Sequence, residues 1–140
     1  FILMGSFIAA ARLSDDLYAA ANALVGHLRG GLSMATVLAC AGFSSVCGSS
    51  FATAATMSKV ALPPMRRYRY ADSLATASIA AGATLGVMIP PSVPLLLYGI
   101  MTRTDVSELF VAGIVPGLLG ALLYIGAVYV PVNLAYRGRI

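Results

Sequence analysis

The chain has 140 residues, of which 59% are hydrophobic and 10% are charged. Soluble domains carry about 45–50% apolar and about 25% charged residues, so this composition excludes a soluble globular domain, a disordered chain and a nucleic-acid binder. The net charge of +4 comes from basic residues in short runs between apolar segments, a pattern typical of membrane orientation. The sequence therefore predicts an all-α integral membrane protein.

The first two predicted elements are the end of a membrane helix and an amphipathic helix. Residues 1–11 are apolar and begin with Phe, so we expect them to be the end of a transmembrane helix inside a longer protein. Residues 13–29 carry apolar side chains at helical spacing, and Asp15 and Asp16 favour a helix start nearby. This second pattern predicts a helix lying in the membrane interface.

Residues 30–58 are a long apolar run interrupted at Gly48, Ser49 and Ser50. One straight helix could cross the bilayer, whereas two arms around this tip would enter and return. If the run returns, Arg103 stands alone on the opposite face; if it crosses, three basic residues lie there. Because positive charge collects on the cytoplasmic side, a re-entrant hairpin is favoured. The basic residues then sharing one face are Arg12, Arg29, Lys59, Arg66, Arg67, Arg69, Arg137 and Arg139.

The remaining elements are a basic loop, a broken helix and a final transmembrane helix. Pro63 and Pro64 predict that the basic loop after the hairpin is not helical throughout. Residues 72–102 are long enough to cross the membrane, but the proline pair within Ile89–Ser92 must break that helix. Residues 109–131 predict one further spanning helix.

The hairpin tip and the helix break are the two places that could carry chemistry. Irregular polar backbone at membrane depth is tolerated only where it is buried in protein or lines a cavity. Carbonyls and hydroxyls freed there form an oxygen cage suited to Na⁺, and the helix N-termini after Ser50 and Ser92 suit a carboxylate. Secondary transporters divide the work in this way at discontinuous helices. The simpler alternative is that the glycines and prolines only allow close packing and a kink.

At these residues the sequence resembles the large membrane subunit of tripartite ATP-independent periplasmic (TRAP) transporters. The residues that carry the resemblance are 39–57 and 60–63, which look like that family's first hairpin, 75–92, which look like its broken helix, and 110–119, which look like the start of the next helix. The resemblance implies one half of an inverted-repeat, elevator-type transporter in the bacterial inner membrane. This multi-pass protein would import small organic acids, such as C4-dicarboxylates, by symport with Na⁺.

The resemblance also implies partners and site residues. The partners are a small membrane (Q) subunit and a periplasmic substrate-binding protein that delivers the organic acid. It implies no catalytic residue, no cofactor and no metal other than the coupling ion. The implied Na⁺ ligands are Gly48, Ser49, Ser50, Gly86, Met88 and Pro90, and the implied substrate-facing residues are Thr53 and Ser92.

Three alternatives stay open from the sequence. The first is a fragment of another Na⁺/carboxylate symporter of the wider ion-transporter superfamily, which would work without a binding protein. The second is an intramembrane enzyme with Ser49 or Ser50 as nucleophile, which would need a nearby base. The third is an assembly subunit that binds no ions.

Overall fold

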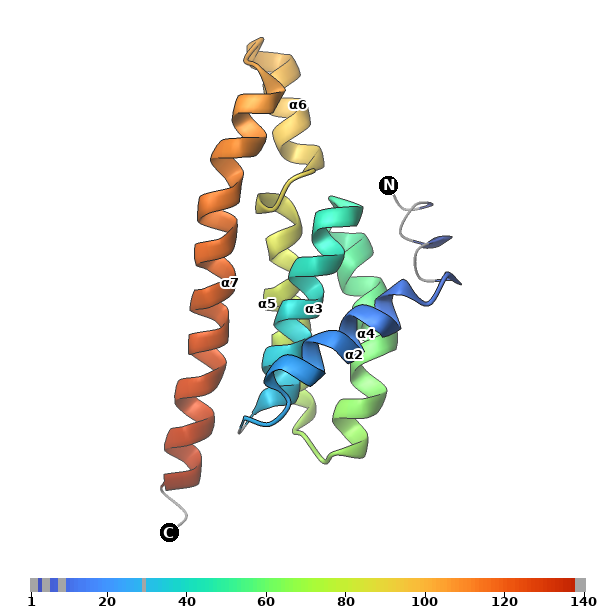
Figure 1. Cartoon of the computed structure of the whole chain (residues 1–140), viewed down its shortest axis with the longest axis vertical. Coiled ribbons are helices and arrows are strands. Elements are labelled where there is room, and N and C mark those ends of the chain that lie inside the picture. Colours follow the sequence, from blue (N-terminus) through green and yellow to red (C-terminus); the bar gives the residue numbers. More distant parts are fainter. Residues whose placement is uncertain (1–2, 4–5, 8–9, 29, 138–140) are drawn as a thin grey trace.

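The computed structural model describes residues 3, 6–7, 10–28 and 30–137, and the regular structure in this part of the chain is helical (Figure 1). Arg29, Arg139 and most of residues 1–11, where the end of a membrane helix is predicted, lie outside the described residues. The helices discussed below are α2 (Leu13–Val25), α3 (Gly31–Cys47), α4 (Ser50–Arg67), α5 (Asp72–Met88), α6 (Val93–Thr102) and α7 (Val106–Arg137).

Helix α3 lies at the centre of the molecule, in contact with α2, α4, α5 and α7. Its side chains are apolar or small around the whole helix, and Ala35, Val37 and Phe43 are completely buried. A helix that is hydrophobic all round is one that neighbours cover on every side. The larger hydrophobic core therefore surrounds α3, with side chains from α2, α4 and α5.

Two glycines make the tight turn between α2 and α3. Gly30 has a φ of 79°, in the left-handed region that glycine adopts without strain. A Cβ on Gly31 would lie 2.3 Å from the carbonyl oxygen of Val25, so a larger residue would open the turn. Helix α2 ends at Val25, four residues before the predicted end at 29. It packs across α3 (Figure 1).

Helices α3 and α4 form a hairpin whose second arm is longer than the sequence predicted. The prediction ended the hairpin at residue 58 and placed Pro63 and Pro64 in a basic loop that is not helical throughout, but α4 continues through both prolines to Arg67. Ala61 and Met65 are completely buried on either side of the prolines. We attribute the continued helix to this packing, which opposes the cost of the two missing N–H donors.

Helices α5 and α6 continue one another across an irregular segment at residues 89–92, and α7 returns alongside them (Figure 1). Asp72–Thr102 and Val106–Leu134 are each long and apolar enough to span a bilayer.

The two arms of the hairpin are shorter than these segments. At 1.5 Å per residue, the 17 and 18 residues of α3 and α4 each reach only about 26 Å. The tip of the hairpin lies at the level of the α5–α6 break (Figure 1).

Candidate functional site

The tip of the hairpin is the first part of the candidate site. Gly48 has a φ of 62° and its N–H donates to the carbonyl of Ser44 at 2.8 Å, which ends α3. Ser49 is extended and is the N-cap of α4, where its hydroxyl accepts from the backbone N–H of Ala52 at 3.5 Å. The chain thus reverses within two residues, and Ser50 already belongs to the second arm.

Two fully buried hydroxyls lie directly beneath this tip. The hydroxyl of Thr53 donates to the carbonyl oxygen of Ser49 at 2.9 Å and lies 3.4 Å from the hydroxyl of Ser44. Both side chains are 0% exposed, so an unpaired hydroxyl at either position would be costly. The pair links the last turn of α3 to the first turn of α4 and holds the geometry of the tip.

The break between α5 and α6 is the second part of the site, and it lies against the tip. The N–H of Val93, at the start of α6, donates to the carbonyl of Gly48 at 3.2 Å. A Cβ on Gly86 would lie 3.1 Å from the backbone nitrogen of Ser50 and 3.2 Å from the hydroxyl oxygen of Ser44. The glycine therefore lets the backbones of the tip and of α5 approach closely.

Ser92 links the irregular segment back to the last turn of α5. Its hydroxyl donates to the carbonyl of Val87 at 2.6 Å, across the residues where the helical bonding stops. Its side chain is 2% exposed, and it is the N-cap of α6 without a capping bond of its own. Ser92 therefore satisfies a carbonyl that the unwound segment would otherwise leave free.

Met88 and Pro90 contact a different helix. A Cβ on Gly113 of α7 would lie 2.9 Å from the carbonyl oxygen of Met88 and 3.6 Å from the Pro90 ring. Gly117, one turn further along α7, similarly approaches Ile89, with 3.0 Å from its ideal Cβ to that side chain. Small residues four apart thus bring α7 against the break, a spacing typical of closely packed membrane helices.

The structure therefore brings together part of the predicted site. Gly48, Ser49 and Ser50 meet Gly86 and Val93, the residue after Ser92, at one junction, whereas Met88 and Pro90 lie against α7. Both residues predicted to face substrate, Thr53 and Ser92, are buried and make local backbone bonds. The roles predicted for these eight residues stay predictions.

Neutral oxygens and backbone amides are the chemical groups that this junction offers. No group of His, Cys, Asp and Glu side chains suited to a metal ion occurs among the described residues. Uncharged oxygen atoms that could bind a cation come from the carbonyls of the junction and from the hydroxyls of Ser44, Ser49, Thr53 and Ser92. Such hard oxygen ligands suit an alkali cation at a discontinuous helix. The N-terminus of α4 adds free N–H groups, which favour an anion.

Sequence reasoning missed Ser44 as a member of the site. Its hydroxyl lies between Thr53 and Gly86, and its carbonyl accepts the bond that ends α3. The available signal was spacing, because a residue four before a helix-ending glycine supplies the carbonyl that the glycine N–H binds.

In the described part of the chain the regular structure is helical, two segments are able to span a bilayer, and an unwound polar junction lies beside one of them. This construction is typical of a membrane transport protein. Residues 1–138 match the family described as tripartite ATP-independent periplasmic transporter, DctM component, and the chain belongs to that family.

The chain is also similar to individual proteins that are named as TRAP transporter permeases. Over 93% of its length the chain is 41% identical to the C4-dicarboxylate TRAP transporter large permease protein DctM of Pseudomonas aeruginosa, and 36% identical to the protein of the same name in Vibrio cholerae. It is 39% identical, over 87% of its length, to the isethionate TRAP transporter permease protein DctMQ of Oleidesulfovibrio alaskensis. The chain spans 30%, 29% and 19% of these three proteins, respectively.

Proposed function

We propose that this chain is part of the large permease of a Na⁺-coupled TRAP transporter that imports small organic acids through a bacterial inner membrane. Residues 30–67 would enter the membrane and return as a re-entrant hairpin, within one half of an inverted-repeat, elevator-type permease. The junction of hairpin tip and broken helix would bind the coupling ion. Transport by the whole protein would require the parts of its relatives that this chain does not span.

The observation that carries the proposal is the direct contact between the two irregular segments. The bond from the Val93 N–H to the Gly48 carbonyl and the close approach of Gly86 to Ser50 place both segments in one junction. A cation bound to oxygens of both would tie the hairpin to the broken helix. Occupancy by Na⁺ could then control whether the tip is closed, which couples the ion to the solute.

The proposed solute is a small organic anion, with C4-dicarboxylates as the first candidates. Two of the relatives above are named for C4-dicarboxylates and one for isethionate, a sulfonate. What these solutes share is a compact anionic group, which the free N–H groups at the start of α4 would favour. Thr53 and Ser92 are buried, which supports a role in holding the backbone of the junction in place. The anion itself would bind at the backbone N–H groups of α4.

The proposed partners are the small membrane (Q) subunit and a periplasmic substrate-binding protein. Both are required parts of a tripartite transporter, and the family membership is what supports them here. The same membership favours this function over a symporter that works without a binding protein. It also favours transport over an intramembrane enzyme with a serine nucleophile and over an assembly subunit that binds no ions.

The test is Na⁺-dependent uptake by the full-length permease, with its small subunit and cognate binding protein, in proteoliposomes. A panel of C4-dicarboxylates, other carboxylates and isethionate would identify the solute. Ser49→Ala should weaken the dependence on Na⁺ because it removes a tip hydroxyl that caps α4.

Ser45→Ala is the matched control for this experiment. Ser45 is an exposed serine of the same hairpin, and its hydroxyl donates locally to the Gly42 carbonyl at 2.7 Å. Its removal should leave the Na⁺ dependence unchanged. Uptake that needs no Na⁺ in the unmodified protein would refute the coupling ion.

A further inference from the structure

A groove separate from the transport junction lies between α2 and the carboxyl-terminal half of α4. Its volume is about 1130 Å³. Apolar lining comes from Leu32, Val60 and the two prolines of α4, whereas polar lining comes from Asn22 and Tyr68. Such a groove can hold an amphipathic molecule with its apolar part along the prolines.

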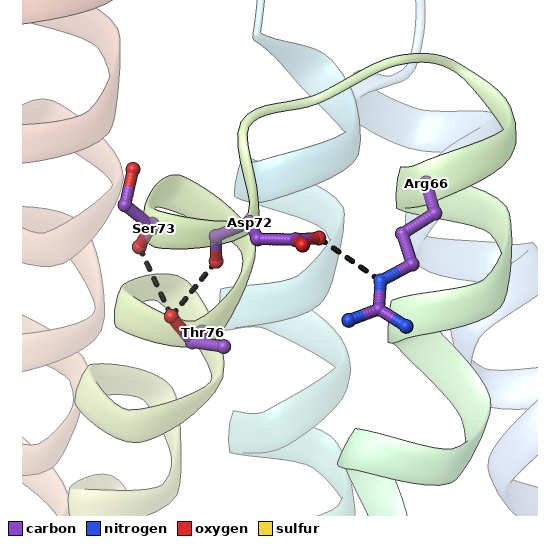
Figure 2. Close-up of polar contacts among 4 residues, drawn as sticks. All are labelled: Arg66, Asp72, Ser73 and Thr76. Atoms are coloured by element: carbon purple, nitrogen blue, oxygen red, sulfur yellow. Dashed lines mark hydrogen bonds and ion pairs between the residues drawn. The ribbon is translucent and has the colours of Figure 1, made fainter.

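The charged lining of the groove is mainly basic. Arg66 and Arg67 contribute guanidinium groups, and Asp15 of α2 contributes one carboxylate. The Nε of Arg66 donates to Asp72 at 2.9 Å, while the two terminal nitrogens of Arg66 lie away from that carboxylate (Figure 2). Within the described part of the chain Arg67 makes no ion pair. Donors of both arginines are therefore available to an anion.

The groove lies at the end of the hairpin away from its tip, where Arg66 and Arg67 form part of the last turn of α4 and Arg69 follows. In the proposed membrane arrangement this end is at the cytoplasmic surface, with α2 in the plane of the interface. Tyr68, which lines the groove, is 70% exposed, as expected for an aromatic residue at headgroup level. The groove is thus placed where lipid headgroups are.

We propose that this groove binds an anionic phospholipid, with the phosphate at Arg66 and Arg67 and an acyl chain along Val60, Pro63 and Pro64. The combination of two guanidinium groups with apolar lining from Val60, Pro63 and Pro64 favours a lipid over a soluble anion, which would leave the apolar lining uncovered. The bound lipid would join α2 to α4. The inference rests on the proposed membrane placement and is independent of the ion and the transported solute.

The test is native mass spectrometry of the full-length permease with its small subunit, titrated with phosphatidylglycerol or with phosphatidylcholine of the same chains. Phosphatidylglycerol should bind preferentially. Arg67→Gln should weaken its binding about fivefold, the effect of one basic residue near an anionic surface. Ala19→Trp, which adds bulk at the lining of the groove without changing charge, should weaken binding of both lipids.

Arg69→Gln is the matched control, because Arg69 lies two residues away and does not line the groove. Equal losses in Arg67→Gln and Arg69→Gln would overturn the proposal in favour of diffuse attraction to a basic surface. Displacement of phosphatidylglycerol by millimolar inorganic phosphate would overturn the lipid as the occupant. A failed transport assay with intact lipid binding would refute the proposed function while leaving this inference standing.

Discussion

The close approach of the hairpin tip to α5 depends on the missing side chain at Gly86. Any Cβ there meets backbone atoms of the tip, which cannot move aside as the end of a flexible side chain could. Gly86→Ala should therefore push the tip from α5 and cost about 1–3 kcal/mol of stability, as overpacking does. The change should lower the melting temperature of the full-length permease and raise the Na⁺ concentration needed for half-maximal uptake.

Gly126 of α7 provides the control for this substitution. Among the described residues nothing lies within 4 Å of a Cβ built on Gly126, although it is also a glycine inside a helix. Gly126→Ala should be neutral or slightly stabilising, because alanine favours the helix by about 0.5–1 kcal/mol. Equal losses from both alanines would show that helix flexibility, and not the contact with the tip, is what matters.

The hydroxyl of Thr53 also contributes to the geometry of the hairpin tip. Thr53→Val keeps the shape of the side chain but removes its bond to Ser49 and the contact with Ser44. A loss of about 0.5–1.5 kcal/mol is expected for one such bond, together with weaker Na⁺ dependence of uptake. Thr53→Ser retains the hydroxyl and should behave nearly as the unmodified protein. If Thr53→Val keeps normal Na⁺ dependence, Thr53 has no role in shaping the ion site.

At the scale of elements, the break in the α5–α6 pair is what exposes backbone groups to the tip. Ile89 and Ser92 are both extended, with ψ of 123° and 129°. Pro90→Ala combined with Pro91→Ala should allow part of this segment to return to the helix. The Val93 N–H would then move from the Gly48 carbonyl, and uptake should fall severalfold or more.

Pro131→Ala tests whether the effect is specific to the break. Pro131 is an exposed proline inside α7, far along the helix from the residues that contact Ile89. Its replacement should change uptake little. Normal transport by the double variant at the break would count against a functional role for the unwound segment.

The elements could be predicted more fully than the contacts among them. A Gly-Ser tip and a proline pair limit the backbone locally, so residues 72–102 could be divided into two helices from the sequence alone. The helix through Pro63 and Pro64 could not be predicted in this way, because Ala61 and Met65 on either side are buried against distant residues. Local propensity does not contain that tertiary packing.

The orientation of the predicted ligands could not be read from motifs either. Each residue along a helix turns by about 100°, so neighbours near a break face different partners. Gly86 consequently faces the tip, whereas the carbonyl of Met88 faces Gly113. The residues of the junction could be named from the sequence, but the group that each presents depends on how α7 packs.

At the scale of the whole molecule, α7 shows what the chain lacks. Large apolar side chains on this helix are well exposed, with Leu118 at 60% and Leu122 at 66%. Such a surface requires lipid or further protein against it, and the chain spans less than a third of the relatives compared above. We therefore expect these 140 residues alone, reconstituted in liposomes, to show no Na⁺-dependent uptake. Uptake by these residues alone would show that the parts of the relatives that the chain does not span are dispensable for transport.

The proposed membrane arrangement can be tested directly, because a re-entrant hairpin keeps both of its ends on one face of the membrane. In a full-length permease in which its native cysteines are replaced, His27→Cys and Ala71→Cys flank the hairpin, and Thr104→Cys lies in the loop between α6 and α7. A membrane-impermeant thiol reagent should label the first two positions from the same side and Thr104→Cys from the other. A hairpin that crosses the membrane would instead place His27 and Ala71 on opposite sides. That result would remove the Gly48 tip from the middle of the bilayer, and with it the reason for an ion site there.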